Sequence, residues 1–344
     1  MKDFYVTKDP TDTDFGTGYL HCKLRDDGTG PVSIFDLKER FPFGIVGKAQ
    51  AIHDESVNFF NLMRKEDIPT HYLGNLGNRR MRVYVAHIPP KTGWEDWCKN
   101  RGKKPFLVPI EVVVTNTITP VASLHKRLRS GAMKPSEAGL SRIPEKDEVV
   151  ELREPLITTS TKLGEHDVYR DDLFDIVGLT PDKRSEIQKI AKAANEAARD
   201  YAMNVGLHLA DGKFEFIMGS DDRIYIADTF LTSDENRLLA QANDGSWVDM
   251  SKQFLRNLYT ITGYREKLEE QQEADPPVPF EQWTLPEKLD SMALGTVTDA
   301  SSVLHQQLCK KDRGMNPMST ATRVRNTLEG YMEIYRRDVT GKKL

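Results

Sequence analysis

The stretch ADGKFEF at residues 210–216 predicts a β-strand that decides how the rest of the sequence is interpreted. Strand side chains alternate between the two faces of a sheet. The two phenylalanines therefore point to one face, while Asp211, Lys213 and Glu215 point to the other. A strand with an apolar face and a charged face fits a core on one side and a polar site on the other.

The residues that follow predict a hairpin that brings two acidic side chains together. The SDD segment at 220–222 predicts a turn, and DRIYIADTF predicts the returning strand. Glu215 then lies opposite or nearly opposite Asp228, and like charges facing each other across two strands are destabilising. A bound cation or the neighbouring Lys213 would offset this repulsion. Two such carboxylates can hold Mg²⁺ shared with nucleotide phosphates; a solvated, charged hairpin face is the alternative.

The composition is that of an ordinary soluble protein: 344 residues, 38% hydrophobic and 29% charged, with a net charge of −4. This charge argues against a nucleic-acid-binding surface. The first residues contain no apolar targeting region, and no run of about 18 apolar residues predicts a membrane span. Three scattered cysteines fit a reducing compartment, so we expect a cytoplasmic protein without a structural disulfide.

Residues 1–105 predict a small α/β lobe. Short strands flank a helix over residues 53–68, which Asp54 would cap, and a further strand is expected at 31–36. The segment 91–105 is polar and punctuated by glycine and proline, which predicts a surface excursion and a domain boundary.

Residues 106–344 predict a larger lobe. It begins with the apolar run FLVPIEVVV, which is typical of a strand covered on both faces. The clearest helix starts at Thr180, an N-cap residue, and ends near Gly206. Beyond residue 250 the sequence is mainly helical, so the lobe closes with C-terminal helices.

Two polar segments predict anion-binding sites. In ITTSTKLGEHD, hydroxyl groups surround Lys162 and precede His166 and Asp167, a combination that suits an anion-binding loop. In ASLHKRL, Ser123 would cap a helix whose first turns carry Lys126, and a helix N-terminus favours phosphate. A polar surface loop and a solvated basic face are the respective alternatives.

The segment SDENR at 233–237 carries a further candidate. Arg237 could clamp a phosphate or a carboxylate with two parallel hydrogen bonds. The acidic residues before it could equally be polar loop residues without a site of their own.

The order of these blocks resembles the SAICAR synthetase family, the phosphoribosylaminoimidazole-succinocarboxamide synthases. The blocks that carry the resemblance are, in order, VPIEVVVTN, ASLHKRL, TTSTKLGEHD, GLHLADGKFEF and DTFLTSDENRL. Upstream, VSIFDLKERFPFGIVGK is similar to the family's I-S-A-F-D segment and the turn after it. The similarity extends from about Lys2 to Gly341.

The resemblance implies an α+β, SAICAR synthetase-like fold: a small N-terminal α/β lobe and a larger ATP-grasp-like lobe with C-terminal helices. It implies an ATP- and Mg²⁺-dependent ligase of purine biosynthesis that joins L-aspartate to the carboxylate of the imidazole ribotide CAIR. Phosphoryl transfer of this kind depends on metal neutralisation and positioning. The implied partners are these small molecules, and whether the chain forms a homo-oligomer stays open.

The resemblance also assigns site residues. Lys213, Glu215 and Asp228 would be catalytic, and the two acids among them would bind Mg²⁺. ATP would contact Lys2, Glu111 and Asp228. The substrate-binding residues would be Ser33, Asp36, Ser123, Lys126, Lys162, His166, Asp167 and Arg237.

The sequence departs from the family pattern at several places. The Gly-Lys turn that the family has before the position of Lys2 is absent, Thr115 stands where the family has an arginine, and Thr229 replaces an acid. Two alternatives therefore stay open. One is a ligase of the same fold for another nucleotide or amine, and the other is a ribotide- or nucleotide-binding protein that has lost catalysis.

Overall fold

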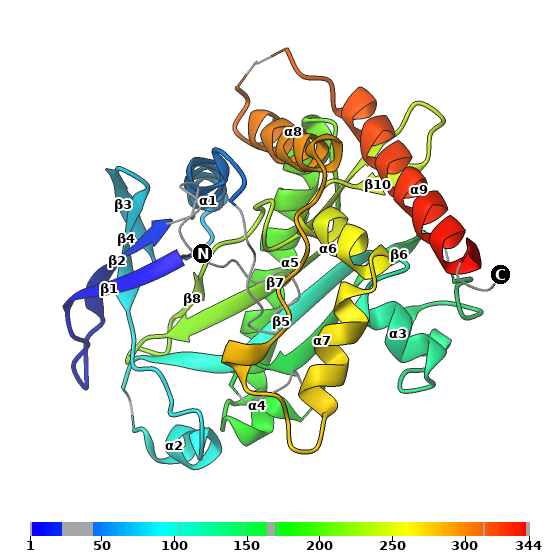
Figure 1. The fold of residues 1–344 in the computed structure, drawn as a ribbon. Coiled ribbons are helices and arrows are strands. Elements are labelled where there is room, and N and C mark those ends of the chain that lie inside the picture. The colour runs from blue at the N-terminus through cyan, green and yellow to red at the C-terminus, as the bar shows by residue number, and fades with distance from the viewer. Residues whose placement is uncertain are drawn as a thin grey trace.

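The computed structural model contains two β-sheets with helices packed around them (Figure 1). The residues that the structure describes are 2–22, 44–102, 104–146, 148–163, 169–170, 172–311 and 314–341. The strand predicted at 31–36 lies outside these ranges.

The first sheet is antiparallel, with the strand order β1-β2-β4-β3. Its strands are β1 (Lys2–Lys8), β2 (Gly16–Cys22), β3 (Tyr72–Gly77) and β4 (Arg80–Val85). In β4 the alternate residues Met81, Val83 and Val85 are buried, as period-two apolar patterning dictates.

Helix α1 (Lys48–Lys65) packs its apolar face on this sheet and begins earlier than the sequence predicted. The prediction that Asp54 caps it is wrong, because Asp54 lies within the helix and Gly47 occupies the N-cap position. The Asp54 carboxylate instead accepts hydrogen bonds from side chains that include His305 of a distant helix. A tertiary contact thus explains an acid that the sequence alone assigned to a cap.

Helix α2 (Trp94–Asn100) lies within the segment predicted to be a surface excursion. That prediction is wrong, because Trp94 and Cys98 are 6% and 0% exposed. These two residues are four apart, so they share one helix face and anchor the segment in the core. The polar residues between them hid this pair in the sequence.

The second sheet has the order β10-β9-β7-β5-β6, with β8 paired to β7. Its strands are β5 (Phe106–Ile118), β6 (Val150–Thr161), β7 (His208–Met218), β8 (Ile224–Ala227), β9 (Arg237–Gln241) and β10 (Trp247–Asp249). The predicted hairpin is present: β7 pairs with β8 in antiparallel register, and Glu215 lies opposite Ala227. Asp228 follows directly, so the acid pair is nearly opposite, as expected.

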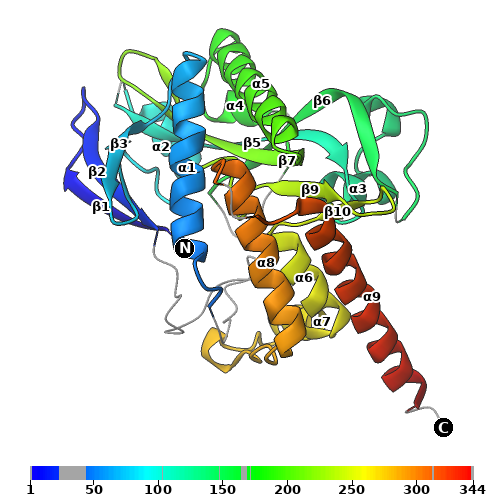
Figure 2. The ribbon, with the colours of Figure 1, turned by 90° about the horizontal axis from the view of Figure 1, so that it is seen from above.

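The remaining helices cover the second sheet. Helix α5 (Pro181–Asn204), capped by the Thr180 side chain as predicted, packs on β5 and β7. Figure 2 shows α5 on one side of these strands and α6 and α7 on the other. The other helices are α3 (Ser123–Arg129), α4 (Leu173–Ile176), α6 (Lys252–Ile261), α7 (Tyr264–Glu273), α8 (Ser291–Leu308) and α9 (Pro317–Gly341), with short 3₁₀ turns at Pro135–Ala138 and Phe280–Gln282.

The chain is an α+β protein, because the strands of both sheets pair in antiparallel fashion and helices pack against these sheets. The first sheet precedes residue 105 and the second follows it, while the boundary at that residue stays a prediction. Two isolated bridges, Thr70 with Ile226 and His87 with Phe106, join the sheets. Across the described residues, no helix combines the length and apolar character needed to cross a membrane.

Candidate active site

Strand β7 carries the candidate site on one face. Asp211, Lys213 and Glu215 alternate along it, while Phe214 and Phe216 are buried in the core. Each of the three charged residues contacts residues from other elements, and the contacts gather at the two ends of the row. An acidic cluster surrounds Lys213 and Glu215, and a basic cavity begins at Asp211.

The acidic cluster joins three strands. Lys213 Nζ donates a 2.8 Å hydrogen bond to Glu111 Oε1 of β5. Lys162, directly after β6, forms an ion pair with Glu215, and its Nζ lies 3.5 Å from Glu111 Oε1. Asp228 follows β8 with a left-handed φ of 57°. The structure therefore places Lys162, predicted in an anion-binding loop, among the metal-binding candidates.

The charges of this cluster leave it short of positive charge. Burial and the nearby Asp228 raise the pKa of Glu215 to about 7, against the opposing effect of Lys162. Burial lowers the pKa of Lys162, but Glu215, Glu111 and Asp228 outweigh it, so this pKa is raised and the ammonium stays charged. Among the described residues, three carboxylates thus face two ammonium groups, those of Lys162 and Lys213.

A divalent cation fits this surplus of carboxylates. Glu111 Oε2 is buried and has no hydrogen-bond partner among the residues that the structure describes, so it can still accept one. Hard cations such as Mg²⁺ take oxygen ligands and commonly use only one or two protein carboxylates together with substrate phosphates. The described residues contain no group of three or more His, Cys, Asp or Glu side chains arranged to hold a metal by themselves.

The basic cavity lies at the other end of the row and has a volume of about 900 Å³. It brings together Ser123, Lys126 and Arg237, three of the predicted substrate-binding residues. Further cationic side chains line it: Arg129, Lys146, Arg256 and Arg265. So many positive charges around one cavity suit a phosphorylated ligand.

Arg237 is held firmly at the wall of this cavity. Its Nη1 donates a 2.6 Å hydrogen bond to Asp211 Oδ2. Burial lowers the pKa of Arg237, but Asp211 and Asp249 outweigh it, so the pKa is raised and the guanidinium keeps its charge. A fixed guanidinium loses little rotamer freedom when it binds an anion.

The prediction that Ser123 caps helix α3 is wrong. Ala122 has the extended backbone of the N-cap, and Ser123 is the first helical residue. The Ser123 hydroxyl lies 3.0 Å from the Tyr169 hydroxyl, a pair in which either oxygen can donate. Ser123 therefore reaches the cavity wall without a capping role.

Sequence reasoning missed part of the site. Arg256 and Lys252 stand four apart on α6, beside Arg237 and Asp234 in a small adjoining cavity. The only signal was the basic pair in SKQFLRN, which the sequence alone placed in a closing helix. Asp234 lies 3.2 Å from the ammonium of Lys48, at the start of α1.

Several predicted site residues cannot be compared with this geometry. Ser33, Asp36, His166 and Asp167 lie outside the described residues. Lys2 is in β1, where it pairs with Cys22, and its side chain is outside the described parts.

Comparison with known proteins gives a family match. The family model described as SAICAR synthetase matches residues 23–271. A phosphoribosylaminoimidazole-succinocarboxamide synthase of Thermoplasma acidophilum is 29% identical over 252 residues, which cover 72% of this chain and 81% of the relative. A putative synthase of the same name from Archaeoglobus fulgidus is 28% identical over 284 residues, covering 78% and 81%.

Solved structures show the same fold. A SAICAR synthetase in complex with ADP is 25% identical, with a TM-score of 0.53 over 74% of this chain and 87% of that chain. The SAICAR-synthase of Saccharomyces cerevisiae, solved with SAICAR, has a TM-score of 0.62 over 91% and 94% of the two chains. The latter is only 18% identical, so its likeness concerns the fold alone.

Proposed function

Because this chain belongs to the SAICAR synthetase family, we propose that it is a carbon–nitrogen ligase that joins L-aspartate to the carboxylate of CAIR at the expense of ATP. The curated relatives carry the name of this activity in purine biosynthesis. A neighbouring structure of the family contains ADP, which supports a nucleotide site here.

One observation carries the proposal: a single face of β7 connects an acidic cluster with a basic cavity. Two residues of a strand span about 7 Å, so Asp211 and Glu215 stand about 14 Å apart along it. A ribotide whose phosphate contacts Arg237 extends its imidazole carboxylate along this face toward Lys213. ATP then approaches the same carboxylate from the side of Glu215 and Asp228.

The acidic cluster would hold Mg²⁺ through Glu215 and Asp228. When bound, the ion neutralises charge on the phosphates of ATP during phosphoryl transfer. Lys213 and Lys162, which now pair with acids, supply two further positive charges beside the transferred group. Glu111 orients Lys213 through their 2.8 Å contact.

The reaction needs no covalent bond to the protein. The carboxylate oxygen of CAIR attacks the γ-phosphorus of ATP, and ADP leaves. The amine of L-aspartate then attacks the acyl carbon, inorganic phosphate leaves with its oxygen, and the amine loses a proton as the amide forms. The protein positions the reactants and stabilises charge, which suffices for phosphoryl transfer.

A mass-spectrometric assay tests the proposal. Purified protein with CAIR, L-aspartate, Mg²⁺ and ATP should yield the succinocarboxamide, and the same mixture without ATP should not. Glu215→Gln should abolish turnover, whereas Glu186→Gln, a matched change on the exposed surface of α5, should leave it intact. Absence of product from the folded parent protein would reject CAIR and L-aspartate as the substrates.

A further inference from the structure

We propose that Glu55 of α1, with Lys48, is a positioning residue that fixes the loop of residues 232–237 and so presents Arg237 to the basic cavity. This inference rests on the proposed ribotide site. It assigns a role to two charged residues that contact neither the acidic cluster nor the lining of the basic cavity.

The contacts between α1 and the loop are short and buried. Glu55, 1% exposed, accepts hydrogen bonds through Oε2 from the Ser233 backbone N–H at 2.8 Å and from Ser233 Oγ at 3.0 Å. Lys48 Nζ donates to Ser233 Oγ at 2.8 Å and pairs with Asp234 at 3.2 Å. An acidic and a basic side chain of α1 therefore both hold Ser233 of the loop.

The loop transmits this restraint to Arg237. Asn236 Oδ1 accepts from the Thr232 N–H at 3.2 Å, and the Asn236 N–H donates to the Thr232 carbonyl at 3.3 Å. Asn236 Nδ2 also donates to the Asp211 carbonyl of β7 at 3.2 Å. The loop is thus one closed turn, held at its start by Glu55 and leading directly into the Arg237–Asp211 pair.

Burying the ionisable side chains of Glu55 and Lys48 is costly if their contact serves only to stabilise the fold. A well-packed apolar pair of similar volume is commonly as stable as a buried ion pair, or more so. In addition, Glu55 Oε1 is buried and has no hydrogen-bond partner within the described parts of the chain. A directional hydrogen-bonding group is needed where the loop must have one conformation, and a binding loop meets that condition.

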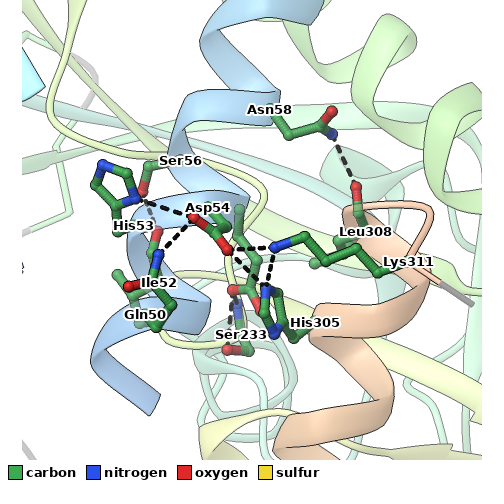
Figure 3. Close-up of polar contacts among 11 residues, drawn as sticks. Gln50, Ile52, His53, Asp54, Ser56, Asn58, Ser233, His305, Leu308 and Lys311 are labelled. Atoms are coloured by element: carbon green, nitrogen blue, oxygen red, sulfur yellow. Dashed lines mark hydrogen bonds and ion pairs between the residues drawn. The ribbon is translucent and has the colours of Figure 1, made fainter. Parts of the chain in front are cut away.

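The neighbouring Asp54 provides a matched control. Its carboxylate lies 3.0 Å from His53 Nδ1 and 3.1 Å from His305 Nε2 of α8, and it accepts a hydrogen bond from Lys311 (Figure 3). Figure 3 shows His305 and Lys311 converging on Asp54. These contacts tie α1 to α8, so Asp54 supports the fold while Glu55 holds the loop.

The test compares variants of the full chain. Isothermal titration with ribose 5-phosphate probes the phosphate site without turnover, and steady-state kinetics give KM for CAIR and for ATP. Glu55→Leu should weaken ribose 5-phosphate binding and raise KM for CAIR by about tenfold, with kcat and KM for ATP unchanged. Glu55→Gln, which keeps an acceptor oxygen, should recover part of this loss. Asp54→Asn should lower the melting temperature and leave both affinities unchanged.

The outcomes separate the two proposals. If the parent protein binds no ribose 5-phosphate, the ribotide site itself is rejected. If the parent binds it and a folded Glu55→Leu protein binds it equally well, only the positioning role is overturned. A fall in kcat with unchanged KM would also overturn that role, since it would indicate a loss of active protein. Should Glu55→Leu fail to fold, Glu55→Gln decides the question, with weaker binding expected.

Discussion

Burial and a neighbouring carboxylate make ionisation of Glu215 in the candidate site costly. Burial and Asp228 raise its pKa from 4.5 to about 7. In the unfolded chain the same group loses its proton near pH 4.5, so between these values the folded chain binds more protons than the unfolded chain. The free energy of unfolding therefore falls as pH rises through this window, in the absence of a bound cation.

Glu215→Gln should remove this pH dependence. At pH 8, in EDTA, the variant should exceed the parent protein in stability by up to about 3 kcal/mol, because no buried charge has to form. The difference should vanish below about pH 4.5, where both side chains are neutral. Urea denaturation between pH 4 and pH 8 measures it, with Glu186→Gln as the exposed control; a less stable Glu215→Gln protein at pH 8 would contradict the expectation.

Arg237→Ala should act on the ribotide and not on ATP. Removing a fixed guanidinium from a phosphate costs about 1.5–3 kcal/mol, which corresponds to about a tenfold to hundredfold rise in KM for CAIR. KM for ATP should stay unchanged, because Arg237 lies at the far end of β7 from Glu215. Arg142→Ala, which removes an exposed arginine paired with Glu148, is the control. Equal rises in both KM values would exclude the assigned role.

The positions of site residues could be predicted where they follow from the local periodicity of the sequence. Alternation along residues 210–216 and one hairpin predicted that Glu215 approaches Asp228, and the pairing of β7 with β8 confirms it. The position of Lys162 among the acids was not predictable, because it depends on the register of β5 with β6. Arg256 was missed for a similar reason, since its place in the cavity depends on how α6 packs.

At the scale of elements, an amide pair joins α5 to β5 beneath the candidate site. Asn116 Nδ2 donates to Asn195 Oδ1 at 3.0 Å, and Asn195 Nδ2 donates back to Asn116 Oδ1 at 2.8 Å. Both side chains are almost fully buried. The pair therefore satisfies polar groups that no water can reach and fixes the helix on the strand.

Asn195→Ala should destabilise the protein without changing substrate affinity. It leaves the Asn116 carbonyl oxygen buried without its partner, which costs about 1–3 kcal/mol. Urea denaturation measures the loss, and KM for CAIR and ATP should equal those of the parent. Asn204→Ala, at the exposed C-terminal end of the same helix, is the control and should lose far less stability. A neutral Asn195→Ala protein would show that the amide pair does not hold these elements together.

Helices and strands could be predicted where the sequence contains a capping residue or a long apolar run. Helix α5 is an example, because Thr180 caps it and Pro181 follows in its first turn. The prediction misplaced the start of α1 and missed α2; both helices start after a glycine with positive φ (Gly47 and Gly93) and have no capping side chain. Without a cap residue, the sequence holds no local mark of where such a helix begins.

For the whole molecule, the order of short blocks was sufficient to predict the family, and the family model confirms it. Each block is a short stretch of sequence, but the site combines residues that are far apart in the chain. Glu55 and Ser233 are 178 residues apart in the chain, and only the tertiary fold brings α1 against the loop that contains Ser233. A contact of this range leaves no signal in a single sequence, because neither residue has a local partner that reveals the other.

The proposed sites at the two ends of β7 predict how ligands change the thermal stability of the whole chain. A non-hydrolysable ATP analogue with Mg²⁺ should raise the melting temperature, since a ligand at 100 times its Kd stabilises the folded state by about 2.7 kcal/mol. EDTA should abolish this shift, because the analogue phosphates then meet the carboxylates of the acidic cluster without a metal ion between them. EDTA alone should leave the melting temperature unchanged, since Lys162 and Lys213 already pair with Glu215 and Glu111.

Asp228→Asn isolates the metal contribution to that shift. Asparagine tolerates the left-handed backbone at this position, so the variant should fold. It should lose most of the shift with Mg²⁺ and the ATP analogue, but keep the full stabilisation by ribose 5-phosphate at the other end of β7. Differential scanning calorimetry of the parent and variant with each ligand measures both effects. If Asp228→Asn retained the full nucleotide shift, the nucleotide would bind this chain without a metal held by the acidic cluster.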